Sequence, residues 1–318
     1  MKIISWNLRN IGINKLARPF TARFQAYGLG NNVLDYMMKV VMGDPVWSNI
    51  NNGYPVDIFV VIELKCGGLK KGEYPPGAPS PTLVTIMTAM NNYANGAGIA
   101  ASYRYNAVPP LIVGRHEAVG IIYNTAALAL VGAAVLRDVN GKFINPRTPF
   151  YTQFTPVAWN NPLHIIGLHA PPPQGGANVR YRPPILFARK VGTVPQLANP
   201  NTMIMGDYNC APNAVYNAGM GNVGWNFPNY GTYIPDGTLT SVRTRLANTQ
   251  QPPANYLSGP YDNLLKNFNG PNIQQQVLDT IGNARNMAVN PIGSTRLSLV
   301  LSNYNKVSDH LPISMYTV

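Results

Sequence analysis

The stretch Thr-Met-Ile-Met-Gly-Asp-Tyr-Asn, residues 202–209, places a short apolar run directly before a polar turn that carries Asp207 and Asn209. A run of this kind predicts a buried strand, and the polar residues stand where the strand leaves the core. The same pattern recurs at three other runs, which end on Asn7, Glu63 and His169. Because strand ends at one edge of a sheet converge, we expect these side chains to form one functional site.

Outward from this stretch, the chain alternates between predicted strands and predicted helices. Apolar or β-branched runs predict strands at 3–6, 57–62, 118–123, 163–168, 202–205, 297–301 and 313–318. Helical patterns cover 32–42, 82–92 and 184–197. Segments rich in Gly, Pro and Asn lie at 70–81, 170–176 and 213–237. This mixture indicates an α/β fold with central strands and functional loops at the strand ends.

The size and composition exclude several classes of protein. A chain of 318 residues with 46% hydrophobic residues can bury a full core without disulfide or metal support. No apolar stretch approaches the roughly 18 residues that a membrane-spanning helix needs. Nothing in the composition marks a linker, so we expect residues 1–318 to form one domain. Gly and Pro, 29 of each, predict abundant loops.

The charge balance favours a polyanionic partner. The chain has 24 Lys and Arg against 12 Asp and Glu, a formal net charge of +12. The basic residues are spread along the chain, which predicts a basic face rather than a basic tail. A merely solvated basic surface is the alternative from charge alone. Cys66 and Cys210 have no metal-ligand spacing and allow one disulfide at most.

The few acidic residues gather in the polar segments at predicted strand ends. Five of the 12 acids are Glu63, Glu117, Asp207, Asp262 and Asp309. Carboxylates that lie together repel one another unless a cation neutralises them. Oxygen ligands without thiolates favour Mg²⁺, with Mn²⁺ or Ca²⁺ as alternatives, over zinc.

Eight short motifs, taken in order, carry a resemblance to a known family. They are WNLRN at 6–10, IELK at 62–65, GRHEAVGIIY at 114–123, NPRTPF at 145–150, GLHAPP at 167–172, GDYN at 206–209, YDN at 261–263 and SDHLP at 308–312. This set resembles the endonuclease/exonuclease/phosphatase superfamily, most of all its deoxyribonuclease-I-like branch, over nearly the whole chain. The resemblance implies a four-layer sandwich of two packed mixed β-sheets flanked by helices. The active site is then expected at one end, between the sheets.

The resemblance also implies a metal site and a water-activating pair. Glu63 with Asn7 matches the family's main metal site, and Asp309 stands where it assists that site. Asp207 and Asn209 match the pair that orients and activates the attacking water. The implied cofactor is a divalent metal ion, Mg²⁺ first.

Two histidine–carboxylate pairs follow from the same resemblance. His310 matches the histidine that contacts the scissile phosphate, with Asp262 as its carboxylate partner. His169 matches the second catalytic histidine, with Glu117 as its acid. Histidine, carboxylate, arginine and metal are the groups that phosphodiester hydrolysis needs. Which histidine acts as the acid stays open.

The implied substrate contacts are basic. Arg9 and Arg147 match phosphate-binding arginines, while Lys65 and Arg115 stand where groove contacts are expected. Asn263 replaces an Arg that is common in the deoxyribonuclease branch after Tyr-Asp, so groove binding is expected to differ in detail.

These features predict a metal-dependent phosphodiesterase, with a largely nonspecific endonuclease acting on double-stranded DNA as the first hypothesis. A sphingomyelinase, an inositol-phosphate phosphatase or a ribonuclease is the alternative within the superfamily, and a catalytically inactive nucleic-acid-binding module is the second. No secretion signal is visible, so we expect a cytoplasmic protein or one exported by a signal-independent route. A basic nuclease of this kind suggests a delivered effector or toxin that is held by an inhibitor or immunity protein. We expect it to be a monomer and to have no membrane partner.

Overall fold

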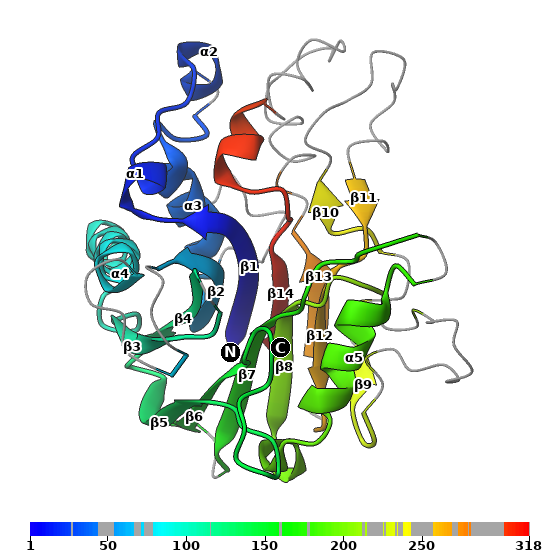
Figure 1. Cartoon of the computed structure of the whole chain (residues 1–318). Coiled ribbons are helices and arrows are strands. Elements are labelled where there is room, and N and C mark those ends of the chain that lie inside the picture. The colour runs from blue at the N-terminus through cyan, green and yellow to red at the C-terminus, as the bar shows by residue number, and fades with distance from the viewer. Residues whose placement is uncertain are drawn as a thin grey trace.

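Two six-stranded β-sheets form the centre of the computed structural model (Figure 1). The first sheet has the order β13-β14-β1-β2-β4-β3 and the second the order β5-β6-β7-β8-β12-β9, with β10 and β11 as a separate pair. The described residues are 1–26, 28–43, 54–66, 71–72, 79–114, 116–158, 161–176, 179–211, 214, 225, 227–232, 234, 238–242, 257–268, 273–278, 280 and 302–317. The predicted strand at 297–301 lies outside them, as do most of the predicted loops at 70–81 and 213–237.

The first sheet contains β1 (Lys2–Ile11), β2 (Ile58–Lys65), β3 (Tyr105–Ile112), β4 (Glu117–Asn124), β13 (Ile273–Val277) and β14 (Ile313–Thr317). The second contains β5 (Leu128–Val135), β6 (Phe150–Pro156), β7 (Leu163–His169), β8 (Thr202–Asp207), β9 (Gly231–Thr232) and β12 (Asp262–Lys266). The small pair is β10 (Ser241–Val242) and β11 (Leu257–Gly259).

Each large sheet has one parallel pair of strands. β1 and β2 are parallel, as are β7 and β8, whereas the other ladders are antiparallel. A parallel pair needs a crossover connection. The segment between β1 and β2 holds α1 (Ile13–Leu16), α2 (Ala22–Gln25) and α3 (Val33–Val41), and the one between β7 and β8 holds α5 (Arg182–Val191) and η2 (Pro195–Ala198). Both crossovers therefore bring polar strand ends to the same edge of their sheet.

The helices begin and end where their sequence dictates. Asn32 caps α3 by accepting a hydrogen bond from the Asp35 amide at 2.9 Å. The predicted helix at 184–197 is shorter than expected, because α5 stops at Val191 before Gly192 and Pro195 opens the 3₁₀ turn η2. α4 (Pro79–Gly96) is longer than its predicted core of 82–92. Among the described residues, no helix is long and apolar enough to cross a membrane.

Three apolar clusters define four layers. The inner cluster joins the two sheets and includes Val60, Val119, Phe150, Ile165 and Met205. A second packs α3, α4 and their neighbours on the first sheet, and a third packs α5 on the second. At the sheet interface, a Cβ on Gly167 would lie 2.8 Å from Val119 Cγ1, so glycine permits the close approach. The predicted four-layer sandwich of two mixed sheets is confirmed.

Strand β3 did not stand out in the sequence. It contains Pro109 and Pro110, which supply no amide hydrogen to a ladder. The fold accommodates them because β3 lies at the edge of its sheet, and the β3–β4 register shifts between Val108 and Leu111. Edge position and a bulge thus allow a strand that its sequence argues against.

Candidate active site

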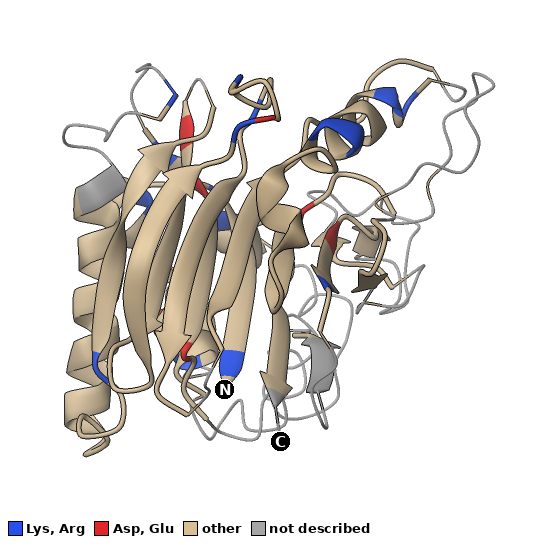
Figure 2. Ribbon diagram, turned by 90° about the horizontal axis from the view of Figure 1, so that it is seen from below, with Lys and Arg blue, Asp and Glu red and all other residues tan. Residues whose placement is uncertain are grey.

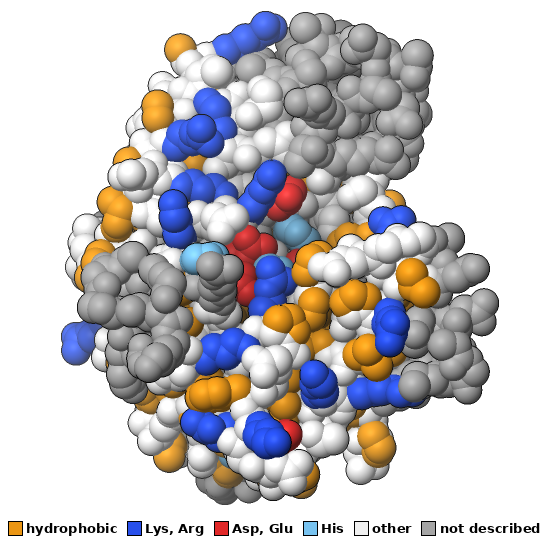
Figure 3. All heavy atoms as spheres, in the orientation of Figure 1, with side chains coloured by type: hydrophobic (Ala, Val, Ile, Leu, Met, Phe, Trp, Pro, Cys, Tyr) orange, Lys and Arg blue, Asp and Glu red, His pale blue; other side chains and the backbone are white. Residues whose placement is uncertain are grey.

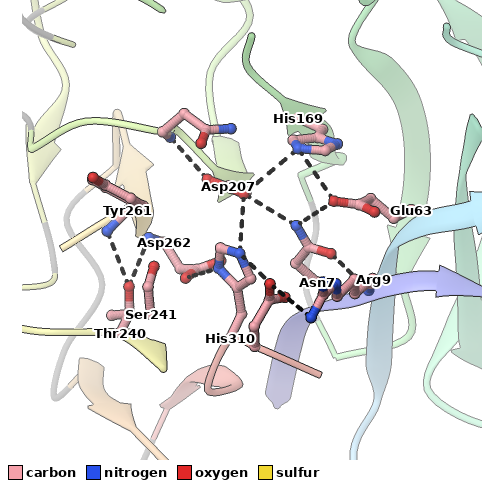
Figure 4. Close-up of polar contacts among 12 residues, drawn as sticks. Asn7, Arg9, Glu63, His169, Asp207, Thr240, Ser241, Tyr261, Asp262 and His310 are labelled. Atoms are coloured by element: carbon pink, nitrogen blue, oxygen red, sulfur yellow. Dashed lines mark hydrogen bonds and ion pairs between the residues drawn. The ribbon is translucent and has the colours of Figure 1, made fainter. Parts of the chain in front are cut away.

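One end of the sandwich collects the polar residues that the strand ends carry (Figure 4). The first sheet supplies Asn7, Glu63 and Glu117, the second supplies His169, Asp207 and Asp262, and Asp309 with His310 come from the segment before β14. His169 is registered against Asp207, and Asp207 against Asp262. The ribbon coloured by charge shows acidic residues near this end of the strands (Figure 2). We refer to these eight residues as the cluster.

A distorted backbone aims Glu63 into the cluster. Glu63 has a φ of +62°, and the β2–β4 register shifts between Val61 and Leu64. A bulge of this kind redirects a side chain at the end of a strand. Its carboxylate is held on one side by the Asn10 amide, which donates to Oε2 at 3.0 Å. Positive φ at a residue other than glycine is costly and concentrates at functional sites.

Asn7 links the two sheets. Its Nδ2 donates to Glu63 Oε1 at 3.1 Å and to Asp207 Oδ2 at 3.0 Å. Its Oδ1 accepts the Arg9 amide at 2.9 Å. The amide nitrogen, rather than the amide oxygen, therefore faces the carboxylates in this structure.

Asp207 lies at the centre, where both histidines approach it. Its Oδ2 is 3.6 Å from His169 Nε2 and 3.6 Å from His310 Nε2. Burial, together with repulsion from Asp262, raises the pKa of Asp207 against the attraction of the two rings. Asp207 Oδ1 accepts the Asn209 amide at 2.8 Å, and Asn209 Nδ2 donates to Ala170 O at 2.8 Å. Asp207 and Asn209 are thus held as one unit.

His310 is paired with Asp262. Its Nδ1 lies 2.8 Å from Asp262 Oδ2, while its Nε2 faces Asp207 and lies 3.8 Å from Asp309 Oδ1. Burial opposes protonation, but attraction to Asp262 and Asp207 outweighs it and raises the pKa of His310 to about 10. The ring is therefore cationic at neutral pH. Trp6 Nε1 donates to the His310 carbonyl at 2.9 Å and fixes the backbone behind it.

His169 is the second histidine, paired with Glu117 at 3.0 Å through Nδ1. Its Nε2 lies 3.5 Å from Glu63 Oε1. Burial lowers the pKa of His169, but Glu117 and then Asp207 attract the proton and the net direction is upward. Burial likewise acts to raise the pKa of Glu117, and the charges of His169 and Arg147 overcome it and lower that pKa.

Arg147 lies at the edge of the cluster, and its guanidinium is paired with residues there. Its Nε lies 2.5 Å from Glu117 Oε1, and its Nη1 donates to Ala170 O at 2.6 Å. The sequence suggested a phosphate contact for Arg147, which stays a prediction. The observed partners make Arg147 a positioning residue for the Glu117–His169 pair.

The other basic residues lie at the rim. Arg9 Nη1 is 3.3 Å from Asp309 Oδ2, and its side chain is 45% exposed, so it is open to a ligand. Lys65 is exposed and registered against Glu117. Arg115 lies outside the described residues. The space-filling view shows Lys and Arg side chains around and below the acidic and histidine side chains at the centre of this face (Figure 3).

Several contributors were missed from sequence. Thr240 Oγ1 accepts the amides of Tyr261 at 3.1 Å and Asp262 at 2.9 Å, and so sets the position of the Asp262 carboxylate. Lys15 Nζ donates to the carbonyls of Leu8 and Arg9, each at 2.6 Å, and supports the bulged backbone there. Burial, opposed by attraction to Asp309, lowers the pKa of Lys15 to about 8. A lone Thr or Lys carries no motif signal.

The donor set fits a hard divalent cation. Two groups, Glu63–Glu117–His169 and Asp207–Asp262–His310, each bring three potential ligand atoms within 4.8 Å of one another. In both groups a carboxylate holds the histidine Nδ1, which leaves Nε2 and the other carboxylate oxygens as the possible ligand atoms. Glu63 and Asp309 are the more exposed carboxylates, with side chains 15% and 26% accessible. Of the predicted ligand set Asn7, Glu63 and Asp309, the two acids present carboxylate oxygens, whereas Asn7 turns its amide nitrogen to the carboxylates and its Oδ1 accepts the Arg9 amide. The set stays a prediction.

The two cysteines do not pair. Cys66 and Cys210 are both free and buried. Burial raises the pKa of the Cys66 thiol to about 11 and that of the Cys210 thiol to about 12. Neither thiol therefore behaves as a nucleophile at neutral pH.

Comparison with known proteins adds a fold relationship. No family model matches the sequence, and no curated protein matches it. Among solved structures, the inositol polyphosphate 5-phosphatase domain of SPsynaptojanin, in complex with inositol (1,4)-bisphosphate and calcium ion, matches with a TM-score of 0.50 at 14% identity. That match covers 99% of this chain and 82% of the other.

Two further solved structures match over nearly their whole lengths. An endonuclease/exonuclease/phosphatase family protein from Leptotrichia buccalis has a TM-score of 0.49 at 11% identity and covers 99% of this chain and 98% of that one. D. rerio TDP2, complexed with single strand DNA product, has a TM-score of 0.46 at 13% identity, with coverages of 99% and 97%. The chain thus shares its fold with the SPsynaptojanin phosphatase domain, and this fold is the four-layer sandwich that the motifs predicted.

Proposed function

We propose that this chain is a metal-dependent phosphodiesterase that hydrolyses the backbone of nucleic acid, with double-stranded DNA as the first substrate, and that residues 1–318 form one catalytic domain. The observation that carries the proposal is the convergence of two histidine–carboxylate pairs on Asp207. Each pair fixes its ring through Nδ1 and turns Nε2 inward, 3.6 Å from the same Asp207 oxygen. Such an arrangement supplies one group to take the proton of an attacking water and another to give a proton to the leaving oxygen.

The water-activating role belongs to Asp207 and Asn209. Asp207 is buried and its pKa is raised by burial, so its carboxylate has the basicity to accept a proton from a water held beside it. Asn209 has a φ of +53° and is anchored on Ala170 O, which fixes its side chain next to the carboxylate. The water oxygen bonds to phosphorus as its proton passes to Asp207.

The histidines bind the phosphoryl group and complete the proton balance. His310 is held cationic by Asp262 and supplies positive charge to a phosphoryl oxygen. His169, charged through Glu117, is placed to give its Nε2 proton to the leaving oxygen as the phosphorus–oxygen bond breaks. Arg9 at the rim adds a second cation for the phosphate.

A divalent ion held by Glu63, Asn7 and Asp309 would neutralise negative charge on the phosphoryl and leaving oxygens. The five carboxylates of the cluster outnumber the two arginines that pair with them, Arg9 and Arg147. With both histidines protonated, and with the charge of Lys15 acting on Asp309 and Glu63, the charges balance. The case for a cation therefore rests on the carboxylate oxygens of Glu63 and Asp309, which a hard divalent ion prefers as ligands.

The substrate class rests on charge. A formal net charge of +12 and the basic side chains around the cluster favour a polyanion over a neutral lipid headgroup. An inositol-phosphate phosphatase is the second candidate, because the SPsynaptojanin domain is described as an inositol polyphosphate 5-phosphatase. The delivered-effector hypothesis, with an inhibitor as partner, rests on the basic composition together with the proposed nuclease activity.

The test is hydrolysis of a substrate panel by the purified protein with Mg²⁺ or with EDTA. The panel comprises supercoiled plasmid, single-stranded RNA, sphingomyelin and an inositol polyphosphate. His310→Ala is the disabled variant, and His164→Gln is its matched control, because His164 Nδ1 bonds the Tyr151 hydroxyl at 2.6 Å instead of a cluster residue. Nicking of plasmid that EDTA and His310→Ala abolish supports the proposal. Hydrolysis of the inositol polyphosphate alone selects the second candidate, and no hydrolysis of any substrate overturns both.

A further inference from the structure

A second hollow lies between the loop that joins β5 to β6 and the end of α5. This pocket has a volume of about 430 Å³. Its lining includes Lys142, Phe143, Asn145, Arg189, Lys190 and Thr193. None of these residues belongs to the cluster.

The pocket is strongly basic. Among the described residues, neither Lys142 nor Lys190 has a carboxylate within ion-pair distance. The one acid in the lining is Asp138, and its Oδ1 already accepts the amides of Asn140 at 2.9 Å and Lys142 at 2.8 Å. Asp138 keeps its negative charge, but the lining also holds Lys142, Arg189 and Lys190, so basic residues outnumber the acid there.

Further cations border the same hollow. The Arg137 guanidinium lies 3.9 Å from the centroid of the Phe143 ring, and Lys71 Nζ donates to Asn145 Oδ1. Burial, and after it repulsion by Lys190, lowers the pKa of Lys71. Cations that gather around one hollow are stabilised by an anion between them.

One end of the pocket is near the cluster. Asn145, in its lining, is two residues from Arg147, whose guanidinium contacts Glu117. Two residues span at most about 7 Å and an arginine side chain a similar length, so Asn145 lies within roughly 15 Å of the Glu117 carboxylate. One strand of duplex DNA carries a phosphate about every 3.4 Å along the axis, so a strand seated at the cluster has phosphates within reach of the pocket. Figure 3 shows basic side chains continuing on this face away from the cluster, where Figure 1 places α5.

We propose that this pocket binds a backbone phosphate of the nucleic-acid strand, a few nucleotides from the bond that the cluster cleaves. The inference rests on the proposed function and names its substrate as a polymer rather than a small phosphoester. Basic residues in the last turn of α5 also complement the helix dipole. That structural role does not account for Lys142, which comes from a different segment and faces the same hollow.

The experiment measures binding of a fluorescent duplex oligonucleotide in EDTA over a range of salt concentrations. Lys142→Gln and Lys190→Gln each remove one positive charge from the pocket. Arg104→Gln removes one charge at the opposite end of the sandwich, where Arg104 O accepts the Thr125 amide just beyond β4. For each pocket variant we expect the salt slope of log K to fall by about 0.9 and Kd to rise roughly eightfold at about 0.1 M salt, with little change for Arg104→Gln.

A second substrate separates this inference from the proposed function. The small diester bis(p-nitrophenyl) phosphate reaches only the cluster, so its Mg²⁺-dependent hydrolysis is expected to be unchanged in Lys142→Gln and Lys190→Gln. Equal duplex affinity and salt slope for the pocket variants and Arg104→Gln would overturn the inference even if the unaltered protein cleaves DNA. If Lys142→Gln and Lys190→Gln weaken the binding of inorganic phosphate but leave duplex binding unchanged, the pocket is a free-phosphate site and the inference is overturned. Failure of the unaltered protein to hydrolyse either diester would instead overturn the proposed function.

Discussion

Replacing Asp262 with asparagine tests whether the His310 pair does the chemistry assigned to it. Asp262 is 3% exposed, and its Oδ2 lies 2.8 Å from His310 Nδ1. The substitution keeps the shape of the side chain and the contact of its backbone amide with Thr240 Oγ1, but removes the negative charge. The ring then loses the partner that fixes its tautomer and favours its cationic form.

The expected loss can be worked from these contacts. Burial opposes protonation of His310, and attraction to Asp262 is the largest of the causes that raise its pKa. In the variant, Asp207 and Asp309 remain 3.6 and 3.8 Å from His310 Nε2. We expect kcat to fall by roughly 10²- to 10⁴-fold, the range typical of general acid–base groups. Loss of a charge-assisted hydrogen bond should lower the free energy of unfolding by about 1.5–3 kcal/mol, which leaves the protein folded.

The assay is the rate of plasmid nicking in Mg²⁺ alongside thermal unfolding. Asp35→Asn is the matched control, because Asp35 accepts the Asn31 amide at 3.0 Å near the start of α3 and touches no cluster residue in the described contacts. A folded Asp262→Asn variant that nicks plasmid within tenfold of the unaltered protein would refute the assignment of His310.

The remaining predictions concern stability and reactivity. Burial lowers the pKa of Lys2 from 10.5 to about 7. Between these two pH values Lys2 is protonated in the unfolded chain but not in the folded one, so the free energy of unfolding should rise with pH. Lys2→Met should remove this rise, as measured by urea unfolding at several pH values. An unchanged pH slope would contradict this. A Cβ on Gly206, at φ +144°, would lie 2.0 Å from Leu168 O, so Gly206→Ala should cost about 2–5 kcal/mol by the same assay; a cost below about 1 kcal/mol would show the backbone there to be adaptable. Cys66 and Cys210 should resist a thiol reagent at neutral pH and react fully only in denaturant, and rapid labelling of the native protein would count against their burial.

Much of the architecture was predictable because the strands that line the site are apolar runs ending in a functional residue. The run before Asp207 forms β8, and the run before His169 forms β7, both fully buried. Burial on both faces produces a continuous apolar signal, and the polar residue then marks the strand end. The four-layer order itself came from the motif resemblance, since periodicity alone does not fix topology.

What the sequence could not reveal depends on long-range contacts. The pairing of Arg147 with Glu117 joins residues thirty positions apart and needs the loop after β5 to fold back on β4. The turn of Glu63 into the cluster depends on a bulge, and nothing in the run 58–65 announces an irregular register. Thr240 acts through a hydroxyl on the backbone of another strand, which leaves no pattern in the chain.

A divalent cation held at Glu63 should be required for phosphodiester cleavage. The decisive measurement is the rate of plasmid nicking as a function of Mg²⁺ concentration, for the unaltered protein and for Glu63→Gln. We expect saturable Mg²⁺ dependence that Glu63→Gln shifts to much higher concentration or abolishes, since a neutral amide is a poorer ligand than a carboxylate. Nicking that needs no divalent metal, or an identical Mg²⁺ dependence in Glu63→Gln, would contradict it.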